Sequence, residues 1–191
     1  MSWLIVLLAL VVAFAGAALA VNRLRSASLQ RQFGPEYHQA VEQTGDRRNA
    51  EAALRDRVKQ RDGLDIRELT PEASARYVEQ WFAVQIRFVD EPRQTVTQAA
   101  ELVTRVMNER GYPAEGSDDH STYVSVDHPA LAAGYRMAEA VRLGAETATI
   151  DDQRQAIQNY RSLFDELLNS RADPADDAAA PGVERAEHDV S

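Results

Sequence analysis

Acidic and imidazole side chains, which together can bind a divalent metal, cluster in one short stretch of the sequence. Its candidate ligands are Asp118, Asp119, His120, Asp127 and His128. A loop between rigid helices is a common place for a metal or catalytic site, and oxygen and nitrogen ligands suit such ions. One hypothesis is therefore a small metal-dependent hydrolase that uses the 118–128 loop.

The same stretch also has a structural interpretation. Asp and Ser side chains cap backbone groups in turns, and Asp127-His128-Pro129 resembles the start of a helix. The spacing matches no named metal motif, and the sequence contains no nucleophile elbow, glycine-rich phosphate loop or helical His-Glu-x-x-His. The sequence therefore favours turn and capping roles here, with no catalytic residue and no cofactor assigned.

A row of aromatic side chains forms the next candidate site. Tyr77, Trp81 and Phe88 recur at helical spacing, with Gln85 beside them. The row could line a pocket in which Gln85 orients a ligand. An aromatic stripe at this spacing is more often part of a core, and a polar side chain within it usually forms a hydrogen bond to a neighbouring helix. We expect the structural role.

The helix that carries these aromatics is the clearest element of the sequence. Thr70 supplies an N-cap hydroxyl and Pro71 suits the first helical position. Apolar residues form a second stripe next to the first, and they are Val78, Phe82, Ile86 and Val89. A helix that is apolar over so much of its circumference is expected in the middle of a bundle.

Other helix boundaries carry local signals. Gly34 suits the end of a first helix, Gly111 the end of another, and Thr149 and Asp152 have the spacing of a capping box. Residues 114–128 lack a helical period and are expected to form a loop. Within it Tyr-Val-Ser-Val alternates like a strand, but the sequence offers no second strand to pair with it.

The N-terminus is the most apolar part of the chain. Residues 3–21 contain no charge, and a helix of 19 residues is roughly 28 Å long, close to the roughly 30 Å hydrocarbon core of a bilayer. The alternative is a cleaved signal peptide, because residues 18–20 have a small-x-small pattern. The missing positive n-region, and an apolar run longer than the usual 7 to about 15 residues, favour a retained anchor in the lipid bilayer through residues 1–22.

Charge sets the expected orientation and the division of the chain. Arginines follow the apolar segment, so the positive-inside rule predicts an external N-terminus and a cytoplasmic body at the bacterial cell membrane. A secreted or extracytoplasmic domain is the alternative. The fold class is all-α, a single transmembrane helix followed by a four- to five-helix bundle. The expected parts are an anchor (1–22), a charged juxtamembrane segment (23–61), a bundle (62–171) and a disordered acidic tail (172–191).

The composition excludes several functions. The 191 residues include no cysteine, which excludes a disulfide scaffold, a zinc-thiolate site and a lipoprotein anchor. A net charge of −9 argues against nucleic acid as a partner. Residues 23–61 have eight Arg and one Lys against five acids, which gives +4. This segment either lies near anionic lipid head groups or spaces the bundle from the membrane.

Four segments carry a resemblance to a known family: FGPEY (33–37), WFAVQIRFVDEP (81–92), RGYP (110–113) and YRSLF (160–164). With them the chain resembles an uncharacterised bacterial family of membrane-anchored or secreted hypothetical proteins. The resemblance spans residues 29–168 and implies no activity. We therefore expect a membrane-tethered helical domain, without enzymatic activity, that binds or scaffolds another protein at the bacterial cell envelope.

Overall fold

The structure is a computed structural model that describes residues 26–113, 117–144 and 147–170, with residues 3, 7, 23 and 24 as isolated positions. Within these residues every regular element is a helix and no strand is present, which confirms the all-α prediction. Residues 26–33 are helical. Seven further helices follow: α2 (Pro35–Thr44), α3 (Arg47–Asp62), α4 (Pro71–Arg87), α5 (Pro92–Arg110), α6 (Ser117–Asp127), α7 (Pro129–Leu143) and α8 (Ile150–Asn169).

Helix ends follow the local signals of the sequence. Thr70 accepts a hydrogen bond from the Ala73 N–H at 3.2 Å and caps α4. Thr149 and Asp152 form both arms of a capping box at the start of α8. Gly111 ends α5 with φ +103°, a conformation that residues with a Cβ rarely adopt. The termini of the helices are therefore fixed largely by residues at the termini themselves.

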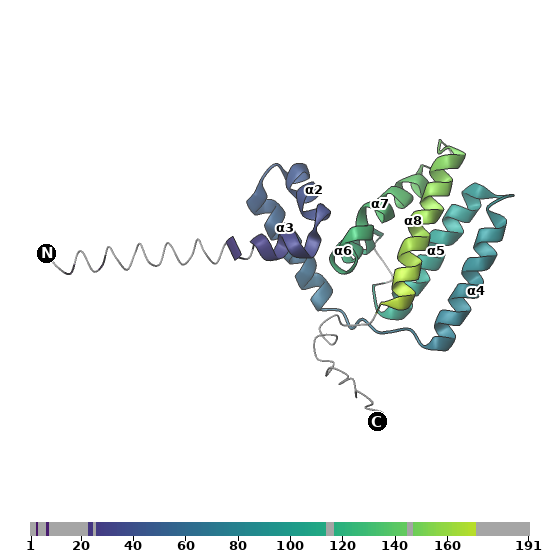
Figure 1. Cartoon of the computed structure of the whole chain (residues 1–191), viewed down its shortest axis with the longest axis horizontal. Helices are drawn as coiled ribbons and strands as arrows, with labels where there is room; N and C mark the ends of the chain where they lie inside the picture. Colours follow the sequence, from purple (N-terminus) through teal and green to yellow (C-terminus); the bar gives the residue numbers. More distant parts are fainter. Residues whose placement is uncertain are drawn as a thin grey trace, which may run out of the picture.

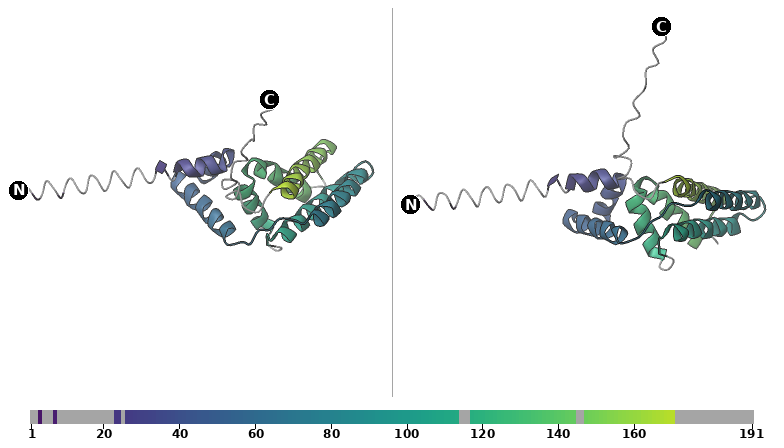
Figure 2. Two further views of the ribbon diagram at one scale, coloured as in Figure 1. Left: turned by 60° about the horizontal axis from the view of Figure 1, so that its bottom comes forward. Right: turned by 90° about the horizontal axis from the view of Figure 1, so that it is seen from below.

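Two hydrophobic cores organise the helices (Figure 1). The larger core is built by α4, α5, α7 and α8, with part of α6. A smaller core lies among the 26–33 helix, α2 and α3, where Phe33 and Leu54 are fully buried. Val126 of α6 completes this second core. In both views of Figure 2 the α2–α3 pair and α4 lie at opposite ends of the described helices, with α6 and α7 between them.

A partly buried ion pair also joins the two groups of helices. The Glu36 carboxylate accepts two hydrogen bonds from the guanidinium of Arg136, at 2.8 and 2.7 Å, and so links α2 to α7. Arg136 also donates to Gln39 at 2.7 Å. Paired, bidentate contacts of this kind fix orientation as well as distance. The helices of residues 26–62 thus pack against the bundle and do not extend away from it.

The structure contradicts the expected position of α4. Its first stripe is buried as predicted, but the second stripe faces outward: Val78, Phe82, Ile86 and Val89 are 53, 64, 60 and 86% exposed. The prediction of a central helix is wrong because α5 and α8 both lie on the Tyr77–Trp81 face, and no described helix covers the other side. We call Ala75, Val78, Phe82 and Ile86, together with Val89 in the turn directly after the helix, the outer stripe of α4.

The structure also contradicts the loop expected at 114–128, because residues 117–127 form α6. This helix packs against α7 and also against α3. Four consecutive residues, 123–126, are therefore buried, the first two in the larger core and Val126 in the smaller one. A helix covered on opposite sides has no single apolar stripe, which is why its sequence lacks the 3.6-residue period.

No helix in the described part of the chain combines the length and the apolar character needed to cross a bilayer. The span expected at residues 1–22 lies almost entirely outside the described residues, as does the acidic tail expected at 172–191.

Candidate functional site

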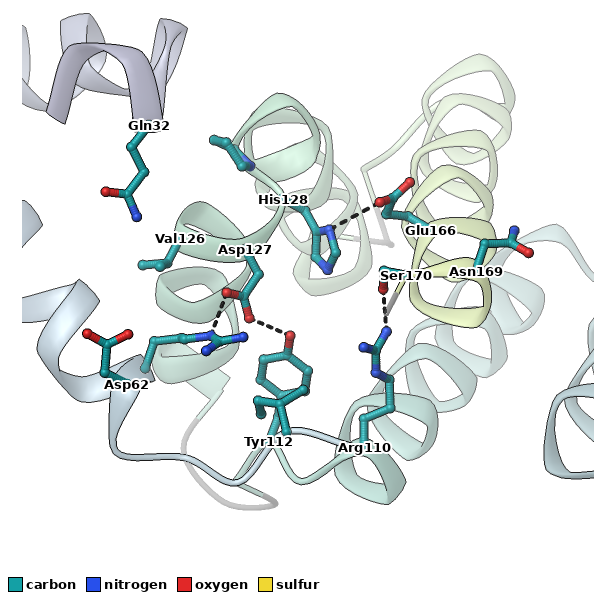
Figure 3. A pocket seen from close by; sticks show the side chains of 13 residues that line it. Gln32, Asp62, Arg110, Tyr112, Val126, Asp127, His128, Glu166, Asn169 and Ser170 are labelled. Carbon is teal, nitrogen blue, oxygen red and sulfur yellow. Dashed lines mark hydrogen bonds and ion pairs between the residues drawn. The ribbon is translucent and has the colours of Figure 1, made fainter. Parts of the chain in front are cut away.

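A polar cleft of about 880 Å³ lies where the C-terminal ends of α3, α5, α6 and α8 converge. We call it the junction cleft. Arg61, Arg110, Asp127 and Glu166 all come from the last turns of these helices. Figure 3 shows the side chains of Arg110, Asp127 and Glu166 around the same space, with Tyr112 below and His128 above it. Segments far apart in the sequence thus meet here because their helices end here.

Asp127 is held from two sides. The Nε atom of Arg61 lies 2.6 Å from its Oδ1, and the Tyr112 hydroxyl donates a hydrogen bond to its Oδ2 at 2.5 Å. Burial of the ring, and then the nearby Asp127 carboxylate, raise the pKa of Tyr112, so the phenol stays protonated and acts as a donor. Both carboxylate oxygens of Asp127 therefore already have partners inside the protein.

His128 occupies the loop position between α6 and α7 and is only 9% exposed. Its Nδ1 lies 3.7 Å from Oε1 of Glu166, and its Nε2 is buried without a hydrogen-bond partner in the described part of the chain. Burial lowers the pKa of His128, against the opposite effect of Asp127 and Glu166, so the ring is neutral at pH 7. The carboxylate favours the proton on Nδ1, which leaves a lone pair on Nε2.

Arg110 is the most deeply buried cation of the cleft, with 2% exposure. Its Nε donates to the carbonyl of Arg67 at 3.2 Å, and its Nη1 donates to the carbonyl of Leu167 at 2.6 Å and to the hydroxyl of Ser170. All three acceptors are neutral oxygens. Burial lowers the pKa of the guanidinium, but an arginine keeps its proton in proteins. Arg110 therefore closes the end of α8 and adds a positive charge to the cleft.

The five predicted metal ligands are not brought to one place. Asp127 and His128 line the junction cleft. His120 instead lines a separate pocket with Glu139, and its Nε2 donates a hydrogen bond to the carbonyl of Pro113, 2.7 Å away. The side chains of residues 118 and 119 lie outside the described part. Among the described residues no group of three or more His, Asp or Glu is placed to hold a metal ion. Metal binding by Asp118, Asp119, His120, Asp127 and His128 stays a prediction.

Several cleft residues could not be identified from the sequence, because nothing in the residues around each of them points to a functional site. They share a position at or just beyond a helix end, and they are Arg61, Arg110, Tyr112, Glu166 and Ser170. One signal was present: the Arg-Gly-Tyr-Pro helix stop places an arginine and a tyrosine on either side of a forced turn. That signal alone does not tell which other helix ends meet it.

The aromatic row of α4 has the structural role that its spacing suggested. Trp81 stacks on Phe164 of α8 with ring centroids 4.8 Å apart, and Tyr77 is buried against α5. Gln85 accepts a hydrogen bond from Nη1 of Arg161 at 3.2 Å, which confirms the expected contact with a neighbouring helix, although the side chain is exposed and not partly buried. The functional candidate on this helix is therefore its opposite face, the outer stripe.

No protein-family model matches the chain, and neither the curated proteins nor the solved structures include a significant match. The resemblance to an uncharacterised bacterial family stays an expectation. The two features that can support a functional argument are the junction cleft and the outer stripe of α4.

Proposed function

We propose that the protein is a membrane-tethered, non-enzymatic interaction module of the bacterial cell envelope, and that the outer stripe of α4 binds a second copy of the same chain. The carrying observation is the exposure of four large apolar side chains in one row, each more than half exposed. A contiguous exposed apolar row on a soluble domain marks an interaction surface, because water contact with it is unfavourable.

The partner is inferred from the symmetry of the row. Val78 and Ile86 each lie four residues from Phe82, and Ala75 and Val89 each lie seven residues from it. Steps of four and seven keep a helix residue on the same face. If two copies of α4 pack antiparallel about a two-fold axis at Phe82, Val78 meets Ile86, and Ala75 faces the turn that follows α4 in the other copy. A surface that is complementary to itself in this way suits a two-fold homodimer.

The membrane anchor compensates for the small area of the contact by raising the effective concentration of the two copies. One helix face buries less than the roughly 800 Å² per partner of a standard interface, so the pair is expected to be weak in dilute solution. Confinement of both copies to one membrane through residues 1–22 raises their effective concentration and populates the pair. The proposal therefore predicts pairing that depends on the anchor.

Cysteine crosslinking of the full-length protein in lipid vesicles tests the partner, because the chain has no cysteine of its own. Phe82→Cys lies on the proposed axis and should give a covalent dimer with a short bis-maleimide reagent. Val78→Cys mixed with Ile86→Cys should give a mixed dimer, while each alone should give little. Leu143→Cys on α7, 76% exposed, is the control for random collision.

Two results would overturn the proposal. Phe82→Cys could crosslink no faster than Leu143→Cys, or Val78→Cys alone could crosslink as well as the mixture. The anchor and its orientation have their own test, in which a C-terminal tag is exposed to protease on sealed vesicles. A tag accessible only from the outer face would contradict the cytoplasmic orientation, and N-terminal sequencing would detect cleavage near residues 18–20.

A further inference from the structure

We propose that the junction cleft binds a small α-hydroxy or α-amino acid, with the carboxylate at Arg110 and the adjacent hydroxyl or amino group at Nε2 of His128. This inference is independent of the pairing through α4. Figure 3 shows the two side chains approaching the same space from opposite sides, Arg110 from below and His128 from above. In an α-hydroxy or α-amino acid the carboxylate and the hydrogen-bond donor are both attached to the α-carbon, so they lie close together.

The carboxylate of the ligand is placed at Arg110, a deeply buried cation that also feels the negative charges of Asp127 and Glu68. Arg110 is almost fully buried, and its hydrogen bonds to Arg67, Leu167 and Ser170 use only Nε and Nη1 and only neutral acceptors. A carboxylate at the guanidinium would receive a charge-assisted hydrogen bond, which is stronger than a bond to a carbonyl.

The hydrogen-bond donor of the ligand is placed at an unsatisfied acceptor of the protein. Nε2 of His128 is buried and has no partner in the described residues, and the Glu166 carboxylate 3.7 Å from Nδ1 favours the tautomer that leaves a lone pair on Nε2. A buried polar atom without a partner is unfavourable, so a ligand that donates to it relieves that cost. A plain carboxylic acid with no α-substituent cannot do so.

The charge of the lining limits the ligand class. Arg61 and Arg110 contribute two positive charges, and Asp62, Asp127 and Glu166 contribute three negative charges. A cleft with this balance disfavours polyanions such as nucleoside triphosphates and accommodates a zwitterion or a monocarboxylate. Its volume of about 880 Å³ leaves room for a side chain, which Ile66 and Val126 can contact.

The test uses the full-length protein in detergent and calorimetric titration. The probes are the twenty protein amino acids and the α-hydroxy acids with the same side chains. For the tightest probe, two matched analogues follow, one without the α-substituent and one without the carboxylate. Each analogue should bind at least about tenfold more weakly, because each loses one of the two polar contacts. The absence of heat and of thermal stabilisation for every probe at about 10 mM would overturn the proposal.

Variants tie the binding to the cleft. His128→Phe keeps an aromatic ring and removes Nε2, so binding should weaken at least about tenfold while the melting temperature does not fall. His120→Phe is the matched control, because His120 lines a different pocket and should leave binding unchanged. Glu166→Gln, at a half-exposed position, weakens the preference for the Nδ1 proton and should reduce binding without unfolding the protein. Unchanged affinity in both His128→Phe and Glu166→Gln would overturn the assignment.

Discussion

Gly111 is the residue whose substitution should harm the fold most for the fewest added atoms. It ends α5 with φ +103°, and a Cβ built on it would lie 2.3 Å from the backbone oxygen of Asp65. The obstacle is backbone, so no side chain can rotate out of the way. Gly111→Ala must therefore displace the segment between α3 and α4, which forms one wall of the junction cleft through Ile66.

The cost can be worked from three contributions. A residue with a Cβ in a left-handed conformation costs about 1–2 kcal/mol. Displacing the segment disturbs the hydrogen bond from the Arg67 N–H to the Arg110 carbonyl, 2.7 Å long, which contributes about 1 kcal/mol. It also disturbs the bond from Nε of Arg110 to the Arg67 carbonyl, where a charged donor contributes about 1.5–3 kcal/mol. Together the three contributions give an expected loss of about 3.5–6 kcal/mol of unfolding free energy.

Gly45→Ala provides a matched control. Gly45 also has a positive φ, +67°, but an added Cβ there meets no heavy atom within 4 Å. The loss of unfolding free energy in Gly45→Ala should therefore be limited to the conformational cost of about 1–2 kcal/mol. Urea unfolding of the full-length protein in detergent, followed by circular dichroism, measures both. Losses that agree within about 0.5 kcal/mol would refute the reasoning, since they would show that the segment beside Gly111 yields freely.

Three further predictions concern a cap, a docking contact and a buried imidazole. Thr149→Ala removes the acceptor of the Asp152 N–H and should lower the unfolding free energy by about 1 kcal/mol in urea; no measurable change would contradict the capping role. A double-mutant cycle of Glu36→Gln and Arg136→Gln should give a coupling energy of about 1–3 kcal/mol, and additive effects would count against the pair as a link between the two cores. Because burial lowers the pKa of His128 below 6.5, the unfolded chain takes up this proton first, so the stabilisation present above pH 6.5 decreases as the pH falls. Unfolding at about pH 7.5 and 5.5 should show a smaller decrease for His128→Phe than for the natural protein, and equal decreases would contradict the buried neutral state.

Local chemistry explains which parts of the fold could be predicted. The caps at Thr70 and Thr149 and the stop at Gly111 depend on residues within one helical turn, so the sequence displays them directly. The outer stripe of α4 could not be assigned to solvent, because periodicity identifies faces of a helix but not which faces other helices cover. Helix α6 was not predicted for a different reason. It is covered by other helices on opposite sides, so its sequence shows no 3.6-residue hydrophobic period.

The junction cleft illustrates a different obstacle. Asp127 and His128 stood out because acids and histidines are conspicuous together, but the partner of each comes from a distant element. Arg61 reaches Asp127 from α3, and Glu166 reaches His128 from α8. Such pairs depend on where helices end in space, and helix propensity and hydrophobic period carry no information about that.

The completion of the smaller core by Val126 has a consequence for biosynthesis. The helices of residues 26–62 leave the ribosome well before the residue that covers Phe33 and Leu54, and Arg136 follows Glu36 by 100 residues. At about 5–20 residues per second this delay is about 5–20 s. During that interval the nascent helices cannot close their core, so their final docking must wait until α6 and α7 have been synthesised. A chaperone or the membrane surface has a defined window in which to engage them.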